Sequence, residues 1–215
     1  MQTLQNRIED LIGPISTHAN IDDSALKDFL ESSAKEIIDI LPNQMLIPYS
    51  ETANFTADKS DAILNSRLLL VTRVDPDGIS TGVAADVEAI QKPLNLKSKV
   101  LDSNSIHYAT KISPVFIIGN DGDITIYPTT TDNGTIYYYP YPAIDIAQTY
   151  IGSAVKKFPE TAHYAVILNS AIKCMQSIIN DLIHTEEDVD LVQAVQVELA
   201  SLQNLYQKEI QRFTV

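Results

Sequence analysis

Few residues in this sequence have the types and spacing that catalytic or binding chemistry requires. The histidines lie far apart and none belongs to a metal-binding pattern such as H-E-x-x-H; they are His18, His107, His163 and His184. With only 7 glycines, the sequence contains neither of the phosphate-binding patterns G-x-G-x-x-G and G-x-x-x-x-G-K-S/T. The single cysteine, Cys174, lies in an apolar run with helical spacing, where a thiolate is disfavoured. We therefore predict a protein that is not an enzyme and that carries no cofactor.

One acidic cluster has a spacing that could suit a metal ion. Asn120, Asp121 and Asp123 could supply oxygen ligands to calcium. A calcium loop of the EF-hand type also needs a bidentate carboxylate at its twelfth position, which falls near Thr131, where the sequence has no Glu. We therefore interpret the cluster, which contains Gly122, as a tight turn between two strands and predict no metal site.

Charge and hydropathy exclude several classes of partner. The formal net charge is -13 and the pI is about 4.5, so we expect no surface that wraps nucleic acid with clustered Lys and Arg. No apolar stretch approaches the ~20 residues that span a bilayer, and no charged segment followed by an apolar run opens the chain. Together with the unpaired cysteine, this predicts assembly in a reducing compartment and no contact with a membrane.

Apolar periodicity predicts helices near both ends of the chain. One short helix is expected over Leu4–Ile12, and a stronger one over 22–41 with an aspartate N-cap at its start. Further on, a broad apolar stripe begins after Pro159, and another follows a turn around 184–187. Because that turn is short, the two stripes predict an antiparallel helical hairpin. The N-terminal helix should pack against this hairpin, since one amphipathic helix cannot bury its stripe alone.

Between the helices, short β-branched runs alternate with turn residues. The expected strands cover 67–74, 82–87, 114–118, 124–128 and 135–141. The first two should form a hairpin and the last three a meander. The predicted fold class is therefore α+β: N- and C-terminal helices, residues 1–45 and 143–215, form an antiparallel bundle, and an antiparallel β-rich subdomain, residues 46–142, is inserted in the sequence.

Tyrosines crowd the last of these strands. Side chains alternate between the two faces of a strand, so one face can bury rings while the other shows them to a partner. We give equal weight to an aromatic core face and to an interface formed by Tyr137, Tyr139 and Tyr141. A sugar-binding platform is a further option, although it would favour tryptophan, which the sequence lacks.

Several motifs follow one another in a recognisable order. They are a helix ending in Leu41-Pro42, the stretch DSNSIHYAT at 102–110, the run PVFII at 114–118, and the strand ends Ile126-Tyr127-Pro128 and Tyr138-Tyr139-Pro140. This order resembles that of the head-to-tail connector adaptors in the neck of tailed bacteriophages. With Phe158-Pro159 and two long helices after it, the pattern is also similar to the tubular tail proteins of short-tailed phages. The resemblance covers most of the chain and concerns packing and turns.

The resemblance implies a structural protein of the virion neck that is assembled in the host cytoplasm. It would form a ring, commonly of twelve copies, docked to the portal protein on one side and to the tail or a neighbouring neck protein on the other. DNA would pass through the lumen without specific binding, which the acidic charge favours because carboxylates repel phosphates. The expected interface residues are Tyr137, Tyr139 and Tyr141 toward the tail, and Tyr206, Ile210, Phe213 and Val215 toward the portal.

Two alternatives stay open at the level of sequence. One is a tail-completion or tail-terminator protein, and the other is a glycan-binding or host-surface binding module that uses the tyrosine strand. The state of assembly separates the adaptor from the binding module. A cyclic ring supports the adaptor, whereas a stable monomer with affinity for glycan supports the binding module.

Overall fold

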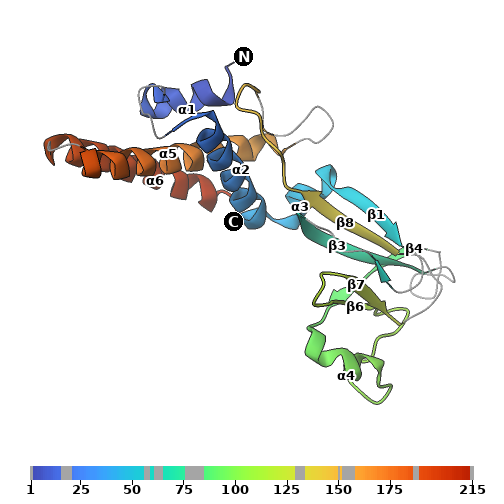
Figure 1. Cartoon of the computed structure of the whole chain (residues 1–215). Coiled ribbons are helices and arrows are strands. Elements are labelled where there is room, and N and C mark those ends of the chain that lie inside the picture. The colour runs from blue at the N-terminus through green and yellow to red at the C-terminus, as the bar shows by residue number, and fades with distance from the viewer. Residues whose placement is uncertain are drawn as a thin grey trace. The chain divides into compact units, whose positions relative to one another are not determined.

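A computed structural model gives the fold, and Figure 1 shows it. The structure describes residues 2–15, 21–55, 59–60, 65–75, 85–128, 134–149, 151, 158–185 and 189–213. Within them the chain forms α-helices and two four-stranded sheets, which confirms the predicted α+β class. It divides into two compact units, Met1–Tyr49 with Tyr141–Val215, and Ser50–Pro140. The sequence had predicted these breaks at 45/46 and 142/143.

The first unit, as far as it is described, is helical. Its α-helices are α1 (Leu4–Ile12), α2 (Asp23–Ile40), α3 (Asn43–Leu46), α5 (His163–Thr185) and α6 (Val189–Gln211), with short 3₁₀ turns η2 (Ile47–Tyr49) and η4 (Glu160–Ala162). The first two helices begin where side chains cap them: Thr3 accepts a hydrogen bond from the amide of Asn6, and Asp22 from the amide of Ala25. α1 ends at Gly13, whose φ of 83° suits glycine.

Helix α5 is the centre of this unit. It packs against α1, α2 and α6, and most of its apolar side chains are buried, including Ala165, Leu168 and Cys174. A helix that is apolar on most sides needs neighbours on most sides, and α5 has three. Helix α6 begins four residues after α5 ends and runs back along it, as the predicted antiparallel hairpin requires (Figure 1).

In its described residues, the second unit contains two β-sheets and one short α-helix. In the first sheet the order is β1 (Glu51–Phe55), β8 (Gly134–Pro140), β3 (Ser66–Asp75), β4 (Ala85–Glu88). In the second it is β2 (Lys59–Ser60), β7 (Ile124–Tyr127), β6 (Val115–Ile118), β5 (Ile90–Gln91). A 3₁₀ turn η3 (Leu94–Leu96) and helix α4 (Lys97–Leu101) follow β5. All pairings are antiparallel except β5 with β6.

Two of the predicted hairpins are present, but the predicted meander is wrong. β3 pairs with β4, and β6 pairs with β7 around a turn in which Gly122 has a φ of 81°. β8, however, leaves the sheet of β6 and β7 and lies between β1 and β3 in the other sheet. The ten-residue β3 offers β8 a far longer pairing edge than the four-residue β7 does, so the distant partner is preferred.

Alternation along the strands divides the apolar side chains of this unit into two clusters. Phe116 and Ile126, on one face of β6 and β7, pack with Phe55, Val71 and Ile136 from the first sheet. On the opposite face, a second cluster joins the second sheet to the α4 region; its members are Val100, Ala109, Val115, Ile117 and Tyr127. The second sheet is therefore covered on both faces, and the α4 region forms the outer layer.

Candidate interaction surfaces

The tyrosines of β8 mostly serve the fold of their own chain. Tyr139 is 4% exposed, which favours the aromatic core face over the interface, the two interpretations given equal weight from the sequence. Tyr138 packs against the first apolar cluster, and its hydroxyl donates a hydrogen bond to Glu51 on the paired strand β1. Tyr137 is half-buried. Because β8 lies between two other strands, its rings are covered more fully than those of an edge strand would be.

Tyr141 belongs to the helical unit and fastens the chain after β8 to α2. Its hydroxyl donates a 2.7 Å hydrogen bond to the carboxylate of Asp39, and the ammonium of Lys35 lies 4.9 Å from the ring centroid. The following segment also attaches to α2, since the carboxylate of Glu31 accepts a 3.1 Å hydrogen bond from the amide of Ile144. Sequence reasoning missed these partners because they come from more than 100 residues upstream.

The end of α6 packs back onto the helical unit. Phe213 is only 7% exposed, so this predicted contact residue is covered by its own chain. Glu209 is also buried and accepts two 2.8 Å hydrogen bonds from the guanidinium of Arg212. Tyr206 and Ile210 keep part of their surface, and Val215 lies outside the described residues.

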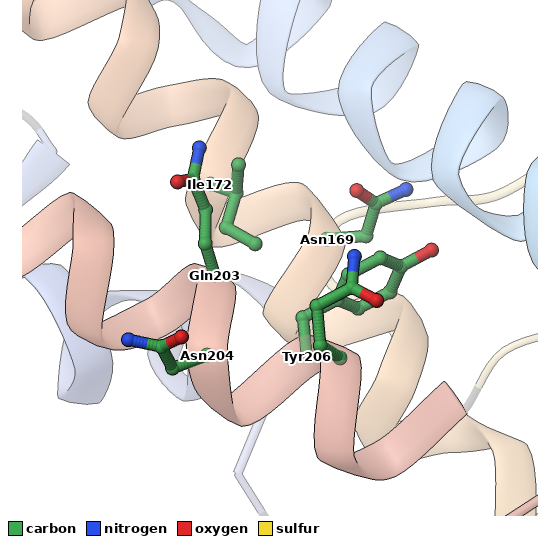
Figure 2. A pocket seen from close by; sticks show the side chains of 6 residues that line it. Asn169, Ile172, Gln203, Asn204 and Tyr206 are labelled. Carbon is green, nitrogen blue, oxygen red and sulfur yellow. The ribbon is translucent and has the colours of Figure 1, made fainter. Parts of the chain in front are cut away.

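A shallow groove of about 400 Å³ runs between α5 and α6. Figure 2 shows Asn169 beside Tyr206, and Gln203 beside Ile172. Side-chain amides dominate its lining, which consists of Asn169, Ile172, Gln203, Asn204, Tyr206 and Gln207. Such a lining can donate and accept hydrogen bonds but carries no charge, so it suits a polar protein surface better than an ionic ligand.

An ion-pair network borders this groove on the α2 side. Lys173 donates 2.8 Å hydrogen bonds to Glu36 and to the hydroxyl of Ser32, and Asn169 donates a 2.7 Å bond to Glu36. Burial raises the pKa of Glu36, but these hydrogen bonds and the Lys173 charge outweigh it and lower the pKa. Burial and the nearby Glu36 charge raise the pKa of Tyr206. The network therefore ties α2, α5 and the groove together in the ionised state of Glu36.

The outer side of the α5–α6 hairpin leaves apolar side chains in solvent. On α6, Leu191, Val197 and Leu205 are 43%, 73% and 42% exposed, and on α5 Ile183 is 57% exposed. The same helix α6 carries an uncharged row of exposed amides; they are Gln193, Gln196, Gln203, Asn204, Gln207 and Gln211. A helix that packs on α5 with one stripe and shows apolar and amide groups elsewhere has surface for contact with another chain.

A second exposed surface, which sequence reasoning overlooked, lies on the outer layer of the β unit. We call residues 90–112 the basic layer. Its exposed large apolar side chains are Ile90, Leu94, Leu101, Ile106, Tyr108 and Ile112. Its lysines are Lys92, Lys97, Lys99 and Lys111. The sequence did contain a signal for this surface, because four lysines occur within residues 90–112 with only one carboxylate, in a chain that is acidic elsewhere.

Among the described residues, no group of three or more His, Cys, Asp or Glu side chains could hold a metal ion. Cys174 is fully buried, and burial raises the pKa of its thiol to about 12. In the part of the chain that the structure describes, no helix is long and apolar enough to cross a membrane.

No protein-family model matches the sequence, and no curated protein matches it at significant similarity.

Proposed function

We propose that the chain is a structural protein of the neck of a tailed bacteriophage, an adaptor that assembles as a ring between the portal and the tail. The observation that carries the proposal is the α5–α6 hairpin, in which α6 keeps Leu191, Val197 and Leu205 exposed beside a row of uncharged amides. Exposed apolar side chains along a rigid helix favour contact between proteins over the binding of a small molecule.

The charge supports the passage of DNA through such a ring. At -13 per copy, a ring of many copies would surround its lumen with a strongly negative field. Phosphates are repelled by that field, so DNA would slide without being held. A lumen lined by Lys and Arg would contradict this part of the proposal.

The C-terminal part of α6 supports a contact with the portal. Tyr206 and Ile210 retain exposed surface there, and the amide-lined groove lies next to Tyr206. The tyrosine strand supports a contact with the tail less strongly, because Tyr139 is buried. The burial of Tyr139 also leaves few aromatic rings on which a sugar could stack, so it does not favour the glycan-binding alternative.

The decisive experiment is quantitative mass spectrometry of purified virions. We expect the chain to be present at the copy number of a ring, and negative-stain microscopy to place that ring at the neck. Absence of the chain from virions, or a single copy per particle, would overturn the proposal.

A truncation tests the portal contact. A chain ending at Tyr206 lacks Ile210 and Phe213 and should no longer attach to the portal, whereas a chain ending at Phe213 keeps the buried ring and serves as the folding control. Far-UV circular dichroism must show that both are helical. Unchanged attachment of a folded chain that ends at Tyr206 would exclude this end of α6 from the portal contact.

A further inference from the structure

Charge is distributed unevenly along this acidic chain. The basic layer contains four lysines against one carboxylate, Asp102, a net charge of +3. The rest of the chain therefore carries -16. Lys97, Lys99 and Lys111 are exposed. A positive surface of this kind attracts an acidic partner and repels a basic one.

The same layer exposes more apolar surface than its position in the fold requires. Val100 and Ala109 pack in the second apolar cluster with Val115, Ile117 and Tyr127 of β6 and β7, and this contact holds the layer against the sheet. Ile106, by contrast, is 96% exposed, and Leu101 and Ile112 are 53% and 56% exposed. Six large apolar residues are exposed within 23 consecutive positions, and the hydration of such an apolar surface is thermodynamically unfavourable.

Hydrogen bonds within residues 102–108 close the loop that presents Ile106. The carboxylate of Asp102 accepts a 2.9 Å hydrogen bond from the amide of Asn104, and the hydroxyl of Ser105 accepts a 3.1 Å bond from the amide of His107. The backbone closes a further turn, since the amide of Tyr108 donates to the carbonyl of Ser105. Ile106 is thus held outward by its own loop, and binding would require little ordering of the loop.

A surface of opposite charge lies on the same chain, around the far end of the α5–α6 hairpin. The described residues 181–185 and 189–198 contain three carboxylates, Asp181, Asp190 and Glu198, and neither Lys nor Arg. Of these carboxylates, Asp190 and Glu198 are exposed on α6. Three apolar side chains of this segment are also exposed: Ile183, Leu191 and Val197. We call residues 181–185 and 189–198 the acidic end.

We propose that the basic layer of one copy binds the acidic end of a second copy of this chain. The two surfaces are complementary in charge, and each adds exposed apolar groups that the contact would bury. Two copies of an acidic chain otherwise repel each other, so a self-contact is favoured where the positive surface takes part. Where a copy gives its basic layer to one neighbour and its acidic end to another, the contact is heterologous and passes from copy to copy, which generates a ring where the rotation closes. Only that closure rests on the proposed neck function.

Charge reversal tests the contact directly on the full-length chain. Mass photometry and sedimentation equilibrium, taken to the highest soluble concentration, should show self-association of the wild-type chain that weakens as salt is added. Lys97→Glu with Lys99→Glu should weaken it by about tenfold or more. The matched control, Lys27→Glu with Lys208→Glu, changes the net charge equally at exposed positions outside both surfaces and should weaken it far less.

A compensating swap identifies the partner surface. Asp190→Lys with Glu198→Lys alone should also weaken association, and mixing this variant with Lys97→Glu/Lys99→Glu should restore mixed oligomers, because each then offers the other a complementary surface. Ile106→Ser with Ile112→Ser, at exposed positions, should leave thermal stability unchanged and still weaken association.

The outcomes separate this inference from the neck proposal. A wild-type chain that stays monomeric at all concentrations, or reversed variants that associate as well as the wild type, would overturn the contact. If the lysine variant associates normally but is lost from virions, the basic layer binds a different protein, and the self-contact is again wrong. Absence of the wild-type chain from virions would instead remove the neck function and leave a measured self-contact standing.

Discussion

Gly134 is the position where a single methyl group should test the packing of the β unit most sharply. It opposes Phe55 across the β1–β8 pair, and the Phe55 ring covers it. A Cβ built on Gly134 would overlap three ring carbons of Phe55, the most distant at 2.8 Å. Since Phe55 is 7% exposed and belongs to the first apolar cluster, the ring cannot swing aside without losing contacts there.

The magnitude follows from two opposing effects. Forcing a methyl group into a packed site costs about 1–3 kcal/mol. Replacing glycine by alanine within a strand returns about 0.5–1 kcal/mol through reduced freedom of the unfolded chain. Because the methyl group would overlap three ring carbons, the cost lies in the upper part of its range, about 2–3 kcal/mol, and we expect Gly134→Ala to lower the free energy of unfolding by about 1–2.5 kcal/mol. Gly119→Ala is the matched control, because its Cβ would meet only the carbonyl oxygen of Asp123 at 3.6 Å.

Urea unfolding followed by near-ultraviolet circular dichroism measures the effect, with the two units allowed separate transitions. A second background, Phe55→Leu, identifies the cause: a smaller, flexible side chain can yield to the methyl group, so the cost of Gly134→Ala should fall by about 1 kcal/mol. The reasoning is refuted if Gly134→Ala is neutral, or if its cost is equal in both backgrounds.

Two further predictions concern pH and are measured by urea unfolding over a pH series. The pKa of Glu36 lies below its ordinary value of 4.5, so the ionised carboxylate stabilises the fold above pH 4.5. That stabilisation is lost as the pH falls through the pKa of Glu36 in the folded state. Glu36→Gln should remove this pH dependence of the free energy of unfolding. Burial and the charge of Arg7 lower the pKa of His163 below 6.5, so the unfolded chain binds that proton first and stability falls below pH 6.5. His163→Phe should flatten the curve there, and an unchanged slope would contradict the assignment.

The helical part of the fold could be predicted because its signals are local. α1 has the predicted bounds, Leu4–Ile12, since apolar spacing and Gly13 define both of its ends. The sequence offered Asp22 and Asp23 as caps for α2, and Asp22 is the one that caps it. The pairing of β8 with β3 joins residues more than 60 positions apart, and no local pattern encodes such a choice. The short strands β2 and β5 have two residues each, too few to show alternation.

The interaction surfaces were harder to predict because exposure is a tertiary property. Alternation placed the β8 tyrosines on two faces of the strand, but the sequence of the strand does not show which residues elsewhere in the chain bury Tyr139. Phe213 continues the heptad spacing of α6, and it is buried as that spacing indicates. A side chain that packs inside its own chain is not available for the portal contact to which it was also assigned. Ile106 gave no signal, because an isolated apolar residue in a loop has no period to place it.

The proposed neck function and the proposed self-contact constrain each other. If the lumen repels DNA, Lys97 and Lys99 cannot line it, because every copy would then add positive charge where phosphates pass. The basic layer must therefore be covered, or face away from the lumen. Docking against the acidic end of the next copy covers it and removes Ile106 from water. A ring reconstruction that placed Lys97 and Lys99 around the lumen would contradict both the self-contact and the DNA-repelling lumen.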